Sequence, residues 1–367
     1  MRTIIKRVAL VLVMASIALV SCKKNDNPNS LNASEEGVLK LKIMANNLPI
    51  SYNMVDYVSD GTTKSVGSSN ENTANDLKIK TLEVFIFNSV TGNLDCYKKY
   101  TSSDNLSLIE IKTQVGSKVI YAIANSHKED WNGIVSLDLF KKQVTSLKEE
   151  NFGDFTMVGS TNATLSNSST ATLSIKRLIS KIVLDEIKVS FNGTPYEGEV
   201  LSNVKAYLIN VSGSKYYHDN SNVTPAQILN YKGFVPSDTL SAKMPRMLYE
   251  NVASSIGTTA FSTPLYFYSY ENLLAEETTD NRFTKLVIQG DLKGKTYYYP
   301  ILINREGYGY VAANGHQGIQ SNTVYRIKVT IKKTGSDSPD IVIQNGTFSI
   351  TTTIEDWNNT ESSDIEF

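Results

Sequence analysis

The chain has 367 residues, with 36 basic and 37 acidic side chains, so its formal net charge at neutral pH is −1. No basic stripe is present, and the sequence therefore offers no electrostatic case for nucleic-acid binding. Tyrosine occurs 20 times, whereas proline occurs nine times and tryptophan twice. With abundant Thr, Ser, Asn, Val and Ile, this composition favours strands over helices.

The first residues have the layout of a secretory signal peptide. Three basic residues precede the apolar run Val8–Val20, which is too short to span a bilayer comfortably. The run ends in Leu19-Val20-Ser21-Cys22, which resembles the lipobox of bacterial lipoproteins. We expect cleavage after residue 21 and a lipid on Cys22; an ordinary signal peptide with an incidental cysteine is the alternative.

A lipid on Cys22 places the mature protein outside the cytoplasm, at the cell outer membrane. Each buried methylene of an acyl chain contributes about 0.8 kcal/mol, so several chains hold a protein firmly. Removal of residues 1–21 takes away three basic residues and no acidic ones, which leaves a net charge of −4. The polar residues 22–36 are expected to be a flexible tether.

The first half of the body reads as β-strands with one helix. Val38–Ile43 is a short strand candidate before a long polar loop. Ile79–Phe87 is apolar on both faces, as is Lys118–Asn125, which indicates central strands. Leu137, Phe140, Val144 and Leu147 recur at helical spacing behind Ser136, which predicts a helix with Ser136 as its N-cap.

A change of phase marks the expected domain junction. Between Thr172 and Phe191 the apolar side chains shift from odd to even positions and back. One flat strand cannot do this, because a slip of one residue sends every side chain to the other face. We expect an N-terminal β-sandwich over residues 37–177 and a C-terminal one over 178–367.

The second half continues with strands that alternate in the same way. The fold class predicted for the whole is therefore all-β with a minor helix. The strand candidates are Val204–Val211, Leu265–Tyr270, Phe283–Gln289, Tyr297–Ile303, Val324–Ile331 and Phe348–Ile354.

A search for catalytic, metal-binding and cofactor motifs finds none. The segment Gly290–Thr296 is one residue short of a phosphate-binding loop and has strand-like sequence on both sides, so it is expected to be a hairpin turn. The three histidines are scattered without metal-ligand spacing and are expected on the surface or in loops. The pairs Glu149-Glu150 and Glu276-Glu277 are expected on solvated faces. The prediction is a non-enzymatic protein without cofactor or metal.

Two aromatic clusters in the sequence suggest an alternative function. Tyr266-Phe267-Tyr268 and Tyr297-Tyr298-Tyr299 contain side chains of the kind that stack on sugars. Structural packing is favoured, because alternate members of a strand face the core. The alternative reading is a lipid-anchored outer-membrane glycan-binding protein, and a surface hydrolase with a carboxylate pair is a third.

Several stretches together resemble the fimbrillin family of major fimbrial subunits, the lipoprotein-derived pilins of type V pili. They cover most of the mature chain in the expected order. They are the lipobox at Cys22, LEVFIFNSVTGNL, KVIYAIAN, FTMVGS, KRLISKIVL, LYFYSYEN, and NTVYRIKVTIKKTGSDSP with Trp357 near the end.

The resemblance implies two tandem β-sandwich domains of a transthyretin-like, Greek-key type. It also implies assembly by strand exchange, in which a protease removes the first strand and the C-terminal strand of another subunit fills the groove. The implied partners are other fimbrial subunits in a head-to-tail polymer, the outer membrane through the lipid, and a host protein or glycan receptor.

Two segments of this sequence fit the roles of the removed first strand and of the donor strand. The candidate displaced strand has Val38, Leu39, Leu41 and Ile43, and the candidate donor strand has Phe348, Ile350 and Ile354. Both segments staying in their own domains is the alternative.

The family's shaft subunits are cut after an arginine near the first strand, yet no arginine lies between Arg7 and Arg177. Lys64 is the candidate cleavage site instead. Without a cut, the subunit keeps its lipid as a basal anchor or lies at a tip.

Overall fold

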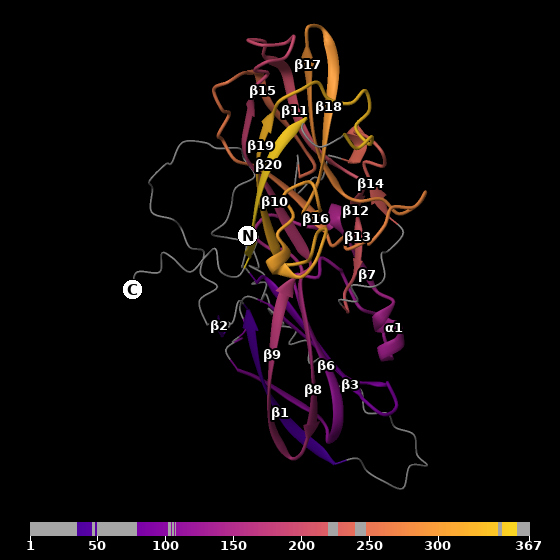
Figure 1. The fold of residues 1–367 in the computed structure, drawn as a ribbon. Helices are drawn as coiled ribbons and strands as arrows, with labels where there is room; N and C mark the ends of the chain where they lie inside the picture. The colour runs from indigo at the N-terminus through magenta and orange to yellow at the C-terminus, as the bar shows by residue number, and fades with distance from the viewer. Residues whose placement is uncertain are drawn as a thin grey trace, which may run out of the picture.

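The computed structural model places two β-rich halves end to end, with the N-terminal half below the C-terminal half in Figure 1. The prediction of an all-β fold is confirmed. No helix among the described residues is long and apolar enough to cross a membrane. The described residues are 35–45, 48–49, 79–101, 104, 106, 108–218, 227–238, 247–343 and 347–357.

The N-terminal half is built from eight paired strands. Their order is β2-β1-β9-β8-β6-β3-β4, and β5 pairs with the other side of β1. The bounds are β1 Glu36–Ala45, β2 Leu48–Pro49, β3 Thr81–Asn88, β4 Leu94–Thr101, β5 Ile109–Gln114, β6 Gly116–Ala124, β8 Met157–Leu165 and β9 Ser168–Arg177.

Strand β3 lies between two apolar cores, which explains why its sequence is apolar on both faces. Leu82, Val84 and Ile86 face the core formed with β1, β5, β6 and β9. Phe85 and Phe87 face the opposite way and join the larger core that reaches into the C-terminal half. The prediction of a central strand with two buried faces is therefore confirmed.

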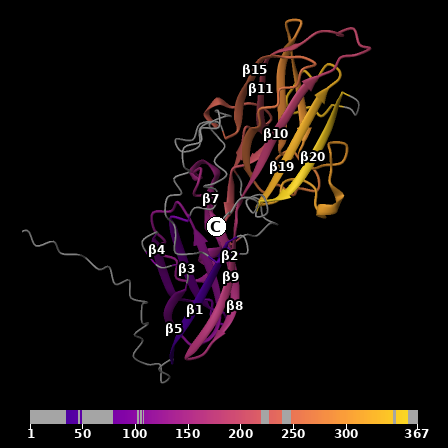
Figure 2. The same cartoon turned by 90° about the vertical axis from the view of Figure 1, so that its left-hand side faces the viewer.

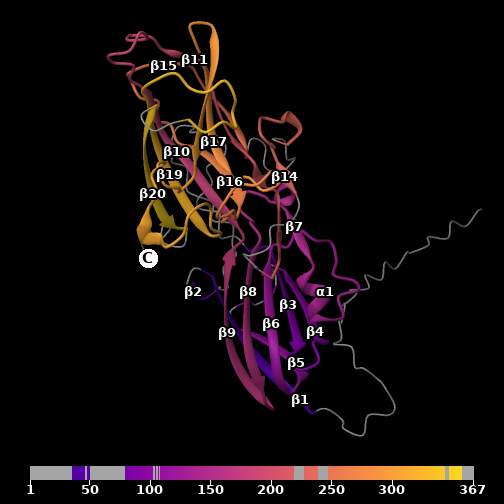
Figure 3. The same cartoon turned by 45° about the vertical axis from the view of Figure 1, so that its right-hand side comes forward.

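The predicted helix begins where expected but is short. The Ser136 hydroxyl accepts a hydrogen bond from the Leu139 amide at 3.3 Å and caps α1 (Leu137–Lys141). Phe140 packs against Phe85 beneath this helix, which lies beside β3 and β4 in Figure 3. The expected continuation to Leu147 is wrong, because Val144 begins β7 (Val144–Ser146), which pairs with β13 (Ser214–Tyr216) of the other half.

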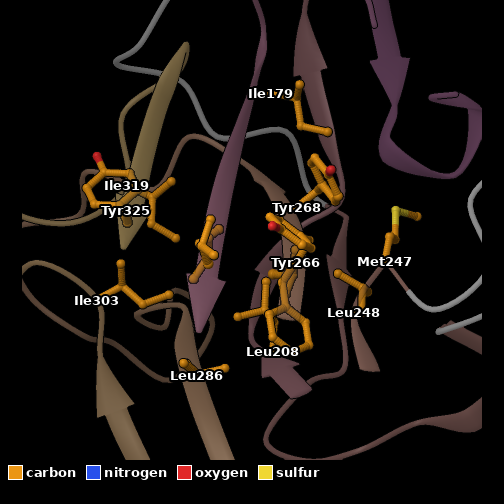
Figure 4. Close-up of a cluster of buried hydrophobic side chains, with 14 of the residues drawn as sticks. Ile179, Leu208, Met247, Leu248, Tyr266, Tyr268, Leu286, Ile303, Ile319 and Tyr325 are labelled. Atoms are coloured by element: carbon orange, nitrogen blue, oxygen red, sulfur yellow. The ribbon is translucent and has the colours of Figure 1, made fainter. Parts of the chain in front are cut away.

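The C-terminal half contains two four-stranded sheets that enclose the larger core. Figure 4 shows part of this core, with Tyr268, Leu208 and Leu286 contributed by different strands. One sheet has the order β16-β10-β19-β20 and the other β15-β11-β17-β18. The bounds are β10 Ile179–Val189, β11 Leu201–Ile209, β15 Tyr249–Ile256, β16 Leu265–Tyr270, β17 Lys285–Leu292, β18 Lys295–Leu302, β19 Thr323–Ile331 and β20 Phe348–Asp356.

Short elements complete the two halves. The C-terminal half has the pair β12 (Val211–Ser212) and β14 (Ile228–Leu229) and the 3₁₀ turns Pro236–Asp238 and Ala312–Asn314, and the N-terminal half has the 3₁₀ turn Leu147–Glu149.

The chain passes between the halves at Leu178. Strand β9 pairs in the first half and ends at Arg177, whereas β10 begins at Ile179 and pairs with β16 and β19. This is the place where the apolar phase of the sequence slips. We infer from the change of sheet that the domain boundary lies at Leu178.

A buried carboxylate ties the halves together. Glu150 is 0% exposed; it accepts hydrogen bonds from the Tyr270 hydroxyl at 2.8 Å and the Thr156 amide at 2.9 Å. Burial and then the charge of Glu150 raise the pKa of Tyr270 well above its usual value. The expectation of a solvated face is wrong for Glu150, because its oxygens satisfy donors inside the junction.

Two further expectations about polar residues are corrected. His127 lies in a loop, as expected, but its side chain is buried with Nε2 3.7 Å from a Glu150 oxygen. Glu277 is not a freely solvated carboxylate, since Oε1 lies 3.3 Å from the buried Lys285 ammonium. The partner of His127 lies 23 residues further along the chain, whereas the cations that hold Glu277, Arg282 and Lys285, follow it within eight residues.

The glycine-rich segment at residues 290–296 is a hairpin turn, as predicted. Strands β17 and β18 pair up to Leu292 and Lys295, which leaves a two-residue connection. Lys293 and Gly294 both have positive φ, at 50° and 80°. Two successive positive φ values are the signature of the tight turn that matches the twist of a hairpin.

Replacing Gly294 with alanine should lower the free energy of unfolding by about 1 kcal/mol, because a Cβ strains left-handed backbone. A Cβ built there meets no atom within 4 Å, so any loss comes from the backbone alone. Denaturant unfolding measures it. Gly233→Ala, where φ is not positive and the Cβ makes an ordinary contact, is the matched control; equal effects of the two would contradict the turn assignment.

Candidate strand-exchange site

The predicted displaced strand β1 lies in the middle of its sheet. It pairs antiparallel with β5 from Glu36↔Gln114 to Leu41↔Ile109, and parallel with β9 from Val38↔Ser168 to Ala45↔Ile175. Figure 2 shows β1 running between these strands. We call the space that β1 fills between β5 and β9 the β1 slot. Both edges of β1 are therefore used in backbone ladders.

One face of β1 is fully buried. Leu39 and Leu41 are 0% exposed and Ile43 is 1% exposed, all within the core of the N-terminal half. The facing walls of the slot supply Ile109 and Ile111 from β5, and Leu173 and Ile175 from β9. Burying such a side chain contributes roughly 1.5–3 kcal/mol. Val38, also named as part of this strand, lies on the opposite, half-buried face.

An ion pair, a backbone hydrogen bond and a close backbone contact fix the register of β1 against its neighbouring strands. On its outer face, Lys40 lies opposite Glu110 with the charged atoms 3.7 Å apart. At its start, the Val38 amide donates to the Asn167 carbonyl at 3.0 Å. A Cβ built at Gly37 would lie 2.2 Å from the Ser166 carbonyl oxygen, so only glycine permits this approach. A strand slipped by one residue would lose all three features.

The remaining predictions about maturation concern residues that the structure does not describe. Cys22 and Lys64 both lie outside the described residues. Lys64 is in the segment 50–78, which links β2 to the residues before β3 in the sequence. A cut in this segment separates β1 covalently from the rest of the chain.

The candidate donor strand β20 occupies the edge of a sheet in the C-terminal half, where Figure 2 shows it beside β19. It pairs with β19 over nine residues, from Thr323↔Asp356 to Ile331↔Phe348. Phe348, Ile350 and Ile354 alternate on one face, as the buried residues of β1 do. Unlike those residues, they are only partly buried. Strand β20 is therefore held less completely than β1.

Asp340 anchors the connection that leads into β20. Its carboxylate accepts hydrogen bonds from the Lys285 ammonium at 2.7 Å, the Asn210 amide at 3.0 Å and Arg282 Nη2 at 2.5 Å. Lys285 is 0% exposed and also donates to the Asp340 carbonyl at 2.9 Å. Asp340 thus holds the connection between β19 and β20 against the rest of the C-terminal half.

The acidity of Asp340 reflects two opposed effects. Burial raises its pKa, but the hydrogen bonds from Lys285 and Asn210 and the charges of Lys285 and Arg282 lower it more, so that the net shift is downward. The folded protein therefore favours the ionised carboxylate. The carboxylate of Asp340 therefore stays charged at neutral pH within this ion-pair cluster.

The aromatic clusters do not form a contact surface. Tyr266, Phe267 and Tyr268 are at most 4% exposed, and Tyr297 and Tyr299 are also buried. Their rings belong to the core of the C-terminal half, and only Tyr298 of these six is half-buried on the outer side. The favoured packing reading is correct, and the argument for sugar stacking at these positions falls away. Among the described residues, no group of His, Cys, Asp and Glu is arranged to hold a metal ion.

Sequence reasoning did not identify Asp340, the slot walls or the role of Trp357. The alternation of Ile109, Ile111 and Thr113 was a readable signal for a half-buried β5. Asp340 gave no signal, because its partners lie 55 to 130 residues away. Trp357 was visible as a large apolar residue near the end, but its buried position depends on the junction between the halves.

Comparisons with known proteins agree with the architecture. The family of the major fimbrial subunit protein FimA matches residues 49–210. The major fimbrium subunit FimC of Porphyromonas gingivalis is 26% identical over 361 residues, which cover 95% of this chain and 69% of that protein.

Solved structures show the same fold. A fimbrilin (FimA) from Porphyromonas gingivalis W83 is similar with a TM-score of 0.61 and 19% identity, covering 88% of this chain and 97% of that one. A candidate cell adhesion protein from Bacteroides eggerthii has a TM-score of 0.59 and 17% identity, with 88% and 97% covered. The predicted resemblance to the fimbrillin family is confirmed by the family match and by the fimbrial relative.

Replacing Leu41 with alanine should destabilise the N-terminal half by about 2–5 kcal/mol, because it leaves a cavity in a closed core. Lys42→Ala, the next residue on the exposed face of β1, should change the unfolding free energy by less than about 0.5 kcal/mol. Urea unfolding of both variants measures the difference. Similar midpoints for the two would mean that β1 does not fill the core.

Asp340→Asn should destabilise the protein at pH 7, and the difference from the wild type should shrink as the pH falls. A carboxyl whose folded pKa is lowered contributes stability above its unfolded pKa of about 3.9, and this is lost as the pH falls through the folded value. Urea midpoints at pH 7 and pH 3 test this. Asp337→Asn, in the same connection but 75% exposed, is the control; a gap for Asp340→Asn that stays constant with pH would contradict the assignment.

Proposed function

We propose that this fimbrillin-like chain is a structural subunit of a cell-surface fimbrium that is exported as a lipoprotein on Cys22 and assembles by donor-strand exchange. The family match, the curated relative and the fold support the role of a fimbrial subunit and a place at the cell surface. Its partners are other fimbrial subunits, and adhesion is the function that the polymer serves.

The position of β1 carries the proposal. This strand uses both of its edges in ladders and buries Leu39, Leu41 and Ile43 completely. Its removal would leave a slot with backbone donors and acceptors on two sides and an apolar floor. A strand of alternating side chains is the natural occupant of such a site.

The incoming strand is proposed to be β20 of another subunit. It lies at a sheet edge, and its apolar side chains at positions 348, 350 and 354 share one face, as those of β1 do, with Thr352 between the last two. Donor and slot lie in different halves of one subunit, so each contact is head to tail. Such contacts do not close on themselves, and a filament results.

Cleavage of the folded chain tests this assembly. The protein from residue 23 onward should remain monomeric until limited trypsin treatment cuts near Lys64, and should then form polymers visible by size-exclusion chromatography and electron microscopy. The variant Lys64→Ala should resist the cut and stay monomeric. Persistent monomers after complete cleavage and loss of β1 would contradict the proposal.

The donor is tested with the same cleaved protein. A synthetic peptide with the sequence of residues 36–45 should cap growth, because it refills the slot. Replacing Ile350 with aspartate should block polymer growth, whereas Thr351→Asp on the exposed face should have a much smaller effect. Polymers that form equally well from the Ile350 variant would exclude β20 as the donor.

A further inference from the structure

The residue that follows β20 is its most deeply buried side chain. Trp357 is 1% exposed, whereas the apolar residues of the strand itself are only partly buried. Its ring packs at the junction of the halves, 5.6 Å from the ring of Phe155 and 6.3 Å from that of Tyr268. The end of a partly buried edge strand is therefore held in a buried position at the junction.

Two buried cations contact this indole ring. The guanidinium carbon of Arg177 lies 4.6 Å from the ring centroid, and the ammonium nitrogen of Lys181 lies 4.7 Å from it. Arg177 is 1% exposed and Lys181 is 3% exposed. A cation over the face of tryptophan is the strongest of the cation–π pairs, and its strength grows when water is excluded.

Asn322 is hydrogen-bonded to the backbone around the Trp357 site. Its carbonyl accepts from the Trp357 amide at 3.2 Å, and its amide donates to the Ile179 carbonyl at 3.0 Å. Its side-chain oxygen accepts from the Arg177 amide at 3.3 Å. One residue therefore links the end of β9, the start of β10 and the end of β20.

The topology makes this end of β20 the one that controls its release. The strand enters from β19 through residues 332–347, and Asp340 anchors that connection. Peeling of β20 from β19 must then begin at the opposite end, which is the end at Trp357. A contact at the end where separation begins must break before any of the hydrogen bonds between β20 and β19 can open.

We propose that Trp357, held by Arg177, Lys181 and Asn322, is a latch that keeps β20 on its own sheet until strand exchange. The timing part of this proposal rests on the proposed function, because only a donor strand has to leave. Arg177 is also the last residue of β9, whose earlier residues form one wall of the β1 slot. The latch therefore lies at the end of a strand that an incoming donor must contact.

Hydrogen exchange on the full chain tests the latch without any polymerisation. Trp357→Leu keeps an apolar side chain but removes the ring, and should speed exchange of the β20 amides by roughly tenfold or more. Exchange in β1 and β17 should stay at the wild-type rate. Arg177→Met, a neutral change that leaves Trp357 in place, should speed β20 exchange in the same direction and serves if the first variant folds poorly.

The second tryptophan of the chain provides the matched control. Trp131 is also buried, at 6% exposed, and has the Lys128 ammonium 4.5 Å from its ring centroid, but it lies against Phe140 and not against β20. Trp131→Phe should leave β20 exchange unchanged, whereas Trp357→Phe should give an intermediate increase. Wild-type exchange of β20 in both Trp357→Leu and Arg177→Met would overturn the latch.

Polymer growth separates the latch from the proposed function. After cleavage near Lys64, Trp357→Leu should polymerise with a shorter lag than the wild type. If β20 exchanges faster but neither protein polymerises, the latch stands and donor-strand exchange fails. If both polymerise with the same lag, the latch does not time the exchange.

Discussion

The pairing of β1 on both edges is the constraint on which the N-terminal half depends. A strand at an edge can leave with the loss of one ladder, but β1 has β5 on one side and β9 on the other. Its buried face also completes the core between the two walls. A parallel ladder cannot come from a hairpin, so β9 must return to β1 from a distance, and β2 to β8 lie between these two strands in the sequence.

The two apolar cores explain how one part of the subunit can change while the rest stays folded. The buried residues of β1 belong to the core confined to the N-terminal half. The larger core runs from Phe85 and Phe140 through the junction into the C-terminal half, and the apolar residues of β20 pack on it. The apolar residues of β1 and those of β20 therefore pack in separate clusters, and the two strands meet through Arg177 at the end of β9, which lies over the ring of Trp357.

The local sequence was sufficient to predict the strands and the junction between the halves, but not the polar contacts between residues far apart in the chain. The two apolar faces of Ile79–Phe87 and the phase slip near Leu178 follow from side-chain alternation, which is a local property. The helix expected up to Leu147 failed because Val144 pairs with Tyr216, a partner that helical spacing cannot reveal. Glu150, Asp340 and Trp357 gained their roles from residues far along the chain, so composition could only suggest that they were solvated or unremarkable.

The number of backbone ladders that β20 makes before and after the proposed strand exchange gives that exchange a direction. In its own sheet β20 has β19 as its ladder partner and leaves Phe348, Ile350 and Ile354 partly exposed. A strand in the β1 slot has two neighbours, and the residues at the equivalent spacing are 0–1% exposed. A donor that moves from an edge to the slot therefore gains a second ladder and buries more apolar surface, each bond adding about 0.5–1.5 kcal/mol net. Against this gain stands the indole of Trp357 at the junction, so the same chain holds both a favourable destination for β20 and a barrier to its departure.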